Sequence, residues 1–405
     1  MMKINYESLS DKYLQILFVA FAFFFPLSVA LSNLVLVLLV LTWLLTGNYK
    51  TKFHKILCNP VAIASLLFFS FHLISMFWTT NLVWGLTILK KMQDFLIFLP
   101  VILTIVKKEN IEIYLLSFFS AMTINLLITF FLYLNSFTNP LNLLSPEVLT
   151  FSLDRINYGI FLIFYIFLIV NYVSQINNNQ KIVPIVLIAF SIFVILASGG
   201  RSAQITFFIS SLVMFFLYRK FNAKNFISIT AILLTIFIAS FQFIENFQTR
   251  INQGYNELTN YIAGKSNTNM SVSIRLKYLD NSIDLIQENL LMGVGIGDFP
   301  DEYKKINKIN SPEGIETVDP HSMYILTFAQ LGIIGFLIFL YIFFVQVKSA
   351  RRFNKKGILY NFGFLIPLVF GVGNLFNSYF LGHYATMLFI FFTAIVYPSY
   401  KHESI

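Results

Sequence analysis

The sequence predicts an all-α polytopic membrane protein with about 12 transmembrane helices and one large external loop. Of the 405 residues, 57% are hydrophobic and 12% are charged, whereas soluble domains contain roughly 25% charged residues. The apolar residues, 48 Phe among them, recur in blocks of about 18 to 25, the length that a helix needs to cross a bilayer core of about 30 Å. A single long polar segment, residues 245–320, interrupts these blocks. The composition therefore excludes a water-soluble fold.

Polar breaks divide the apolar sequence into twelve expected spans. In the first half of the chain these are residues 13–28, 30–46, 60–77, 84–106, 111–134 and 155–173. In the second half they are residues 182–198, 202–218, 226–244, 322–346, 358–376 and 383–398. The first block, which starts near Leu14, lacks a small-residue cleavage site and is followed at once by the second. It is therefore expected to be a retained span rather than a signal peptide.

The distribution of basic residues indicates the orientation. An even number of spans places both termini on one side of the membrane, and Lys and Arg in short loops are retained in the cytoplasm. With the N-terminus inside, the cytoplasmic segments hold 17 of the 28 basic residues: Lys3, Lys12, Lys50, Lys52, Lys55, Lys107, Lys108, Lys181, Arg219, Lys220, Lys224, Lys348, Arg351, Arg352, Lys355, Lys356 and Lys401. The net charge of +9 is thus mostly a topology signal, and nucleic-acid binding is not indicated.

Residues 245–320 lie on the outer face under this topology and contain 7 basic and 11 acidic residues. An outer segment of this length is expected to be functional and partly helical. From Ser273 to Leu291, apolar residues recur at helical spacing and predict an amphipathic helix on the membrane surface; they are Ile274, Tyr278, Ile283, Leu285 and Ile286. The chain is accordingly divided into an N-terminal bundle of about nine helices (1–244), this loop (245–320) and a C-terminal bundle of about three helices (321–405).

Three arginines near outer span ends are candidates for binding an anion. Arg201 lies between two spans, Arg275 begins the predicted surface helix, and Arg155 opens another span. A guanidinium suits a diphosphate because it binds phosphate oxygens with two donors at once and stays charged. The alternative is that each arginine only anchors its span at the interface.

His321 stands where the long loop enters the next span, with Asp319 before it and Ser322 after it. A histidine titrates near neutral pH and can accept a proton from an attacking hydroxyl, although a structural role at the helix start is an equal alternative on position alone. No ligand spacing favours a metal, and Asp298, Asp301, Glu316 and Asp319 are expected to be solvated or to assist His321. The single cysteine, Cys58, excludes an intramolecular disulfide.

The run GVGIGDF at 293–299 lacks the strand, the final glycine and the Lys-Ser/Thr pair of a phosphate-binding loop. It is expected instead to form a tight turn, in which Gly293, Gly295 and Gly297 allow positive φ and direct the loop back toward the membrane.

Three motifs, in this order along the chain, resemble the O-antigen ligase and polymerase superfamily. They are SGGRSA at 198–203, SIRLKYLDNSIDLIQENLLMGVGIGDF at 273–299 and HSMYILTFAQLGIIG at 321–335. The N-terminal runs ALSNLVLVLLVLTWLLTG and NPVAIASLLF are more similar to the ligase branch than to the polymerase branch. One departure is that Gln204 and Ile205 follow the first motif, where the family often has an aromatic residue.

The resemblance implies a GT-C-like fold in the bacterial inner membrane and an inverting glycosyltransferase that works on the periplasmic face without a metal or other cofactor. The donor would be an undecaprenyl-diphosphate-linked glycan, and the acceptor a sugar of the lipid A core oligosaccharide. By position in the motifs, Arg201 and Arg275 correspond to the arginines that hold the donor diphosphate. His321 corresponds to the histidine that activates or positions the acceptor hydroxyl, while Arg155 falls on no equally clear motif.

Three other functions stay open on the sequence. A polymerase would share the motifs and use a second carrier-linked glycan as acceptor. A lipid-linked glycan transporter would be expected to show inverted repeats or broken helices around a midplane site, and neither is evident. A structural scaffold would not require a long loop with arginine and histidine at one membrane face.

Overall fold

The computed structural model describes residues 6–138, 151–173, 175–218, 222–263, 271–312, 314–355 and 357–399, and these residues form helices without any β-strand. Five of the predicted cytoplasmic basic residues lie outside the described ranges: Lys3, Arg219, Lys220, Lys356 and Lys401. The longer helices are α1 (Tyr6–Phe24), α2 (Val29–Leu45), α4 (Pro60–Ser75), α5 (Leu82–Leu96), α7 (Ile111–Thr138), α8 (Arg155–Val173), α9 (Ile182–Ala197), α10 (Arg201–Tyr218), α11 (Ala223–Phe243), α12 (Glu245–Ile262), α13 (Ser271–Glu288), α15 (Met323–Ala350), α16 (Ile358–Phe376) and α17 (His383–Val396). The shorter ones are α3 (Tyr49–Leu57), α6 (Phe98–Ile105), α14 (Phe299–Asn310) and the 3₁₀ turns η1 (Lys108–Asn110), η3 (Asn178–Gln180) and η4 (Tyr379–Leu381).

Every apolar block that the sequence marks as a span is helical in the structure. By length and composition, five helices among the described residues can cross a membrane, namely α7, α8, α11, α15 and α16, or six if the sharply bent pair α2 and α3 counts as one span. The apolar helices α4, α9, α10 and α17 are shorter. The protein therefore has the helices of a multi-pass membrane protein, while the count of twelve spans and the GT-C-like arrangement remain predictions.

The expected single span at 84–106 is wrong in one respect, because the structure divides it into α5 and α6 at Ile97. The cause is Pro100, which has no N–H to donate and whose ring collides with the carbonyl of the residue four positions earlier in a continuous helix. That residue is Leu96, the last of α5.

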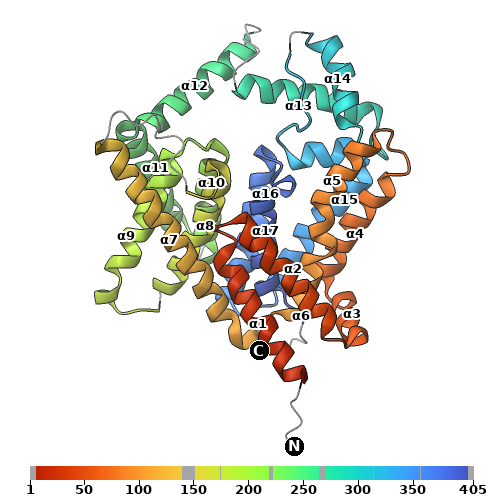
Figure 1. Ribbon diagram of the computed structural model, residues 1–405. Helices are drawn as coiled ribbons and strands as arrows, with labels where there is room; N and C mark the ends of the chain where they lie inside the picture. The colour runs from red at the N-terminus through yellow and green to blue at the C-terminus, as the bar shows by residue number, and fades with distance from the viewer. Residues whose placement is uncertain are drawn as a thin grey trace, which may run out of the picture.

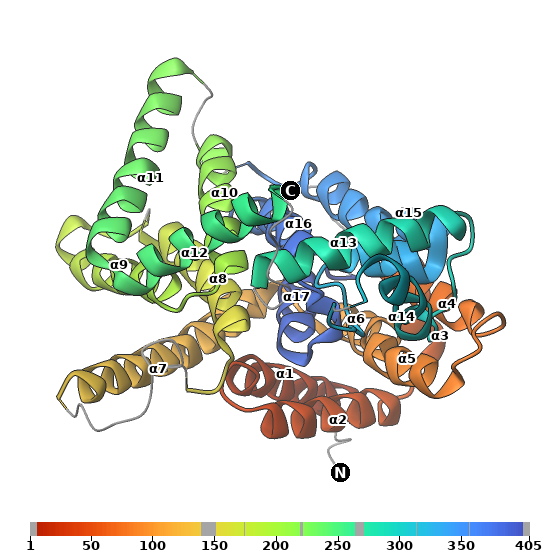
Figure 2. The ribbon, with the colours of Figure 1, turned by 90° about the horizontal axis from the view of Figure 1, so that it is seen from above.

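The apolar core lies around α17, in which twelve of fourteen residues are buried. Its aromatic rings pack against neighbouring segments: the ring centroid of Phe391 lies 5.2 Å from that of Phe25, the residue after α1, and the ring centroid of Phe392 lies 4.5 Å from that of Phe164 of α8. Figure 2 shows α16 and α17 near the centre with the other helices around them. Buried polar side chains join helices where no water competes for them, as in the 2.7 Å bond between the side chains of Asn361 and Asn171.

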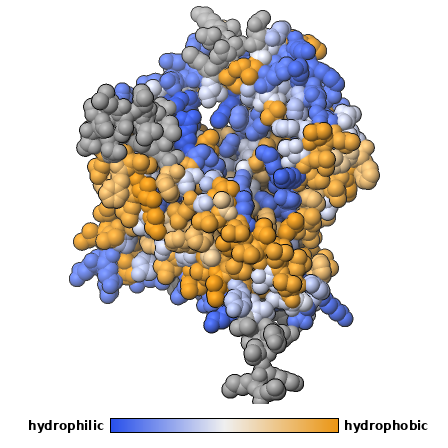
Figure 3. Space-filling model, viewed as in Figure 1, coloured by the Kyte–Doolittle hydropathy of each residue, from blue (hydrophilic) through white to orange (hydrophobic). Residues whose placement is uncertain are grey.

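Helices α12, α13 and α14 form a layer at one end of the bundle, and α1 begins at the opposite end (Figure 1). The predicted loop thus contains three helices and covers the end of the bundle away from the start of α1. Figure 3 shows this end as largely hydrophilic, with a hollow beneath α12 and α13, above a broad hydrophobic band. The band has the polarity that a membrane-embedded surface requires.

The predicted surface helix exists as α13, but its face differs from the expected one. Tyr278, Leu285 and Ile286 are buried as expected, whereas Ile283 is 39% exposed. Asn281 takes part in the buried face through bonds to Tyr303 and Asn307 of α14. The helix packs on α14 and α15, so its buried face is occupied by protein rather than by lipid.

Candidate active site

The SGGRSA segment forms the tight connection between α9 and α10. Gly199 has φ +70° and ends α9 in the left-handed conformation that favours glycine, and Arg201 is then the first residue of α10. Gln204, which follows the SGGRSA motif, is buried and donates to the carbonyls of Leu196 and Ile195 at 3.0 and 3.4 Å. Gln204 thus closes the end of α9, and Arg201 begins the next helix beside it.

Arg155 stands at the same position of the neighbouring helix, as the first residue of α8. The Asp154 carboxylate accepts from the backbone N–H groups of Ile156 and Asn157 and so caps this helix. Below the two arginines, α8 and α10 are so close that a Cβ on Gly159 would lie 2.2 Å from the Cβ of Ala203. The glycine therefore permits the close spacing of the two helices that carry Arg155 and Arg201.

Arg275, on α13, completes a group of three interacting guanidinium groups. Burial is the main cause that lowers the pKa of Arg275, and the positive charges of Arg201 and Arg155 lower it further. The carboxylate of Asp319 acts in the opposite direction and raises this pKa. The structure thus brings together three arginines from three helices, one of which the sequence motifs had not singled out. We call Arg155, Arg201 and Arg275 the arginine cluster.

The arginine cluster lies where several helices begin. Arg155 and Arg201 are first residues of their helices, and Met323, two residues after His321, begins α15. Helix N-termini carry unsatisfied N–H groups and the positive end of the helix dipole, and both favour an anion. Arginine side chains and helix ends therefore combine to make this region suitable for binding a phosphate group.

His321 adjoins the arginine cluster. Its backbone has φ +57°, a left-handed conformation that is uncommon outside glycine and often marks a functional site. Asp319 holds this turn: its Oδ1 accepts the backbone N–H of His321 at 2.9 Å and the Ser378 hydroxyl at 2.6 Å. The other carboxylate oxygen, Oδ2, lies 3.8 Å from Nδ1 of the His321 ring, and the Tyr278 ring stacks at 6.1 Å between centroids.

Burial is the largest cause that lowers the pKa of His321. The Asp319 carboxylate raises this pKa, and the positive charge of Arg275 lowers it. The interaction with Arg275 joins the histidine electrostatically to the arginine cluster. A histidine with a lowered pKa is neutral at physiological pH, which is the state in which an imidazole can accept a proton.

Ser322, a further sequence candidate, has a structural partner for its hydroxyl. It is buried and donates to the carbonyl of Asn374 in α16 at 3.3 Å. This bond joins the start of α15 to the neighbouring helix.

The glycine-rich turn after α13 fits into a break in α15. Gly332 has φ 63° and ψ −166°, a conformation available essentially only to glycine, and interrupts the helical hydrogen bonds there. The freed carbonyls of Ala329 and Gln330 accept from the backbone N–H groups of Val294 and Gly295 at 2.9 and 3.0 Å. The turn is therefore bonded to the helix that follows His321, which fixes the loop relative to the bundle.

Two of the three glycines in this turn have the positive φ that the sequence predicts, Gly293 at 69° and Gly295 at 107°. Gly297 does not, and its role is close packing, since a Cβ there would lie 2.2 Å from the carbonyl oxygen of Asn81.

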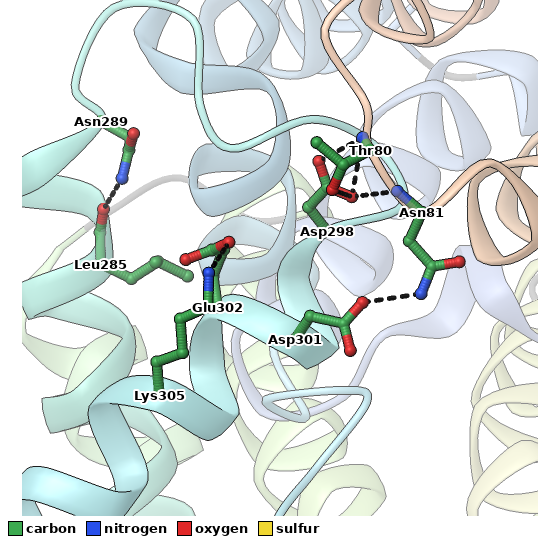
Figure 4. Close-up of polar contacts among 8 residues, drawn as sticks. All are labelled: Thr80, Asn81, Leu285, Asn289, Asp298, Asp301, Glu302 and Lys305. Atoms are coloured by element: carbon green, nitrogen blue, oxygen red, sulfur yellow. Dashed lines mark hydrogen bonds and ion pairs between the residues drawn. The ribbon is translucent and has the colours of Figure 1, made fainter.

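The expectation that Asp298 is solvated is wrong, because it is 3% exposed. Its carboxylate accepts from the backbone N–H of Thr80, the Thr80 hydroxyl and the backbone N–H of Asn81, and the Asn81 side chain reaches Asp301 at 2.7 Å (Figure 4). The α4–α5 connection supplies these donors, so sequence position alone could not reveal the burial. Asp298 thus attaches the loop to a second point of the bundle.

Sequence reasoning missed other polar residues near the site. Glu257, on α12, is 5% exposed and faces Arg201. Tyr379 of η4 is buried and interacts electrostatically with Arg275 and Asp154. Neither residue lies in a recognisable motif, and only the packing of α10, α12 and η4 identifies them.

Two lysines inside helix α5 could have been recognised from the sequence as candidates for a functional role. Lys90 and Lys91 interrupt a predicted span, where charge is expensive and usually functional. Lys91 donates to the carbonyl of Leu381 in η4 at 3.1 Å, so it attaches α5 to the segment that also carries Tyr379.

Within the described ranges, no group of three or more His, Cys, Asp and Glu side chains is arranged to hold a metal ion. The arginine cluster offers guanidinium groups, which bind phosphate oxygens directly.

One curated protein, an uncharacterized protein of Haemophilus influenzae, is 28% identical to this chain over 171 residues, which cover 39% of this chain and 42% of that protein. The match therefore spans less than half of that relative, and its printed name gives no function. A family model described as O-antigen ligase matches residues 186–340. This region runs from within α9 to within α15 and contains Arg201, Glu257, Arg275 and His321. Residues 186–340, which carry most of the candidate site, are therefore similar to the O-antigen ligase family.

Proposed function

We propose that this protein is an O-antigen ligase of the bacterial inner membrane, with both termini in the cytoplasm and the arginine cluster facing the periplasm. It transfers a glycan from undecaprenyl diphosphate to a sugar hydroxyl of the lipid A core. The observation that carries the proposal is the meeting of the arginine cluster with a histidine of lowered pKa, from four segments that are distant in sequence. The family match supports the same reaction class.

In this mechanism the arginine cluster binds the diphosphate of the donor. Arg201 and Arg275 contact its oxygens, and Arg155 adds a third positive charge. Negative charge grows on the diphosphate as the bond between it and the anomeric carbon breaks, so fixed cations stabilise the transition state more than the bound donor. No metal is required for this role.

His321 acts on the acceptor. Its neutral ring accepts the proton of the core-sugar hydroxyl while that oxygen forms the new bond to the anomeric carbon, and the diphosphate departs from the opposite side. The single displacement inverts the anomeric configuration. Asp319 holds the backbone turn of His321 and faces the resulting imidazolium with a carboxylate oxygen, which stabilises the protonated ring.

The experiment is a deletion strain complemented with the wild-type gene or with Arg275→Ala. The ligase predicts loss of polymer from the lipid A core in the deletion strain, with accumulation of full-length carrier-linked polymer, and restoration only by the wild-type gene. Single repeat units on the core would instead identify a polymerase. An unchanged surface-lipid profile would contradict both activities.

A further inference from the structure

Glu257 is a buried carboxylate on a polar helix. Most of α12 is solvent-accessible, and its buried residues are Phe247 and Glu257, the latter 5% exposed. Burying an ionised carboxylate is costly unless partners compensate for the lost hydration. The partners of Glu257 therefore reveal why the residue is placed there.

The two carboxylate oxygens face two different elements. Oε1 lies 3.8 Å from Nη2 of Arg201, the first residue of α10. Oε2 accepts the backbone N–H of Val272, the second residue of α13, where helical N–H groups have no partner of their own. The Ser273 hydroxyl also donates to the main-chain carbonyl of Glu257, at 3.5 Å. One side chain thus joins the starts of α10 and α13.

These contacts link the two arginines assigned to the donor. Arg201 pairs with Glu257 directly, and Arg275 follows Val272 by three residues on the helix that Glu257 caps. One turn earlier on α12, Gly254 leaves room for the Arg201 guanidinium, since a Cβ there would lie 3.3 Å from Nη1. At 3.8 Å the carboxylate attracts the guanidinium without a direct hydrogen bond, so the donor groups of Arg201 stay available to a ligand.

We propose that Glu257 is a positioning residue that sets the relative placement of Arg201 and Arg275 for the donor diphosphate, by pairing with one arginine and capping the helix of the other. The proposal rests on the proposed function. It differs from simple charge balance, which predicts the opposite effect on donor binding: removing a nearby negative charge from a purely electrostatic site would strengthen its attraction for an anion.

Glu257→Gln removes the charge that pairs with Arg201 but keeps the helix cap, because its amide oxygen can still accept the Val272 N–H. The variant therefore separates positioning by the ion pair from simple charge balance. With purified full-length protein, Glu257→Gln is expected to raise the KM for the carrier-linked donor about tenfold, roughly 1.4 kcal/mol. The acceptor KM is expected to change by less than about twofold. A lower donor KM would establish charge balance and overturn the proposal, as would an unchanged one. The control is Glu245→Gln on the exposed first turn of the same helix, which is expected to leave both constants unchanged.

Amide hydrogen exchange gives a second readout that does not depend on activity. Glu257→Ala is expected to increase exchange at Val272 and the following residues of α13, while Glu257→Gln preserves their protection. Equal protection in wild type and Glu257→Ala would contradict the capping role.

A double-mutant cycle separates this inference from the proposed function. Because Arg201→Ala is expected to abolish transfer, the cycle is measured as the Kd for the carrier-linked donor. In an Arg201→Ala background, Glu257→Gln should weaken donor binding by less than it does in the wild type, because the pair no longer exists. If Arg201→Ala itself leaves the donor Kd unchanged, the proposed function fails. If Arg201→Ala raises the donor Kd and Glu257→Gln does not, only the positioning role fails.

Discussion

At the scale of single residues, the site depends on charge that is held in place by protein contacts. Arg201, Arg275 and Arg155 repel one another, and Glu257 and Asp319 are the carboxylates that face them. Sequence reasoning proposed the three arginines and His321 as candidates because they lie near predicted outer span ends, and all except Arg155 also lie in motifs. It could not identify Glu257, because burial of that carboxylate depends on how α12 packs against α10 and α13.

The first prediction concerns the guanidinium of Arg201. Arg201→Ala should abolish transfer while the protein level stays nearly unchanged, and Arg201→Lys should restore only part of the activity, because an ammonium is a point charge without the planar fork of donors. The measurement is transfer in membranes, normalised to protein amount. Full activity of Arg201→Ala would remove this residue from the site.

The second prediction concerns the protonation of His321. Because its pKa is lowered, the neutral ring should persist below the ordinary pKa of about 6.5. Diethyl pyrocarbonate modifies neutral imidazole, so the midpoint of its reaction with His321 should lie below that of a histidine peptide. Arg275→Gln should raise this midpoint and Asp319→Asn should lower it, since the two charges act in opposite directions. A midpoint at or above 6.5 in the wild type would contradict the assigned environment.

At the scale of elements, close contacts between helices set the geometry of the site. The apolar blocks predict the helices well because a long apolar run has few other folds available in a membrane. The sequence did not predict α12 or α14, whose residues are mostly polar. It also did not predict the backbone hydrogen bonds that join the glycine-rich turn to α15 at the break at Gly332. That join is made between segments that are separate in sequence, and no local pattern specifies it.

The third prediction tests the contact between α8 and α10. Gly159→Ala should force these helices apart, because the new Cβ would meet the Cβ of Ala203 at 2.2 Å. Overpacking of this kind costs about 1–3 kcal/mol, and displacing Arg155 and Arg201 should slow transfer on the order of 10- to 100-fold. Melting temperature and transfer rate are the measurements.

A compensating change makes this test specific. Ala203→Gly in the Gly159→Ala protein removes the opposing Cβ and should restore most of the rate. Gly371→Ala, whose Cβ would meet its nearest neighbour at an ordinary 3.7 Å, is the matched control. Failure of Ala203→Gly to restore activity would show that the helix spacing is not the cause.

At the scale of the whole molecule, the protein has a polar layer at one end, a hydrophobic band below it, and the start of α1 on the opposite side. The hydropathy and the basic residues predicted this division. The relative placement of α8, α10, α13 and α15 could not be predicted in this way, because it follows from packing among helices of similar composition. The active-site proposal depends on that packing.

The fourth prediction is the orientation of the polar layer. The loop after α15 carries Arg351 and Arg352 and should be cytoplasmic, whereas α12–α14 should face the periplasm. Alkaline phosphatase, which is active only outside the cytoplasm, should be inactive when fused after Lys355 and active when fused after Ser311. The reverse pattern would contradict the topology.

The central claim is that the arginine cluster binds the donor while His321 acts on the acceptor. Its most direct test compares His321→Ala and Arg275→Ala, purified and reconstituted, for both binding and transfer of a carrier-linked glycan. His321→Ala should bind the donor normally and lose on the order of 100-fold or more in transfer rate, whereas Arg275→Ala should lose donor binding. Normal transfer by His321→Ala, or normal donor binding by Arg275→Ala, would contradict the account.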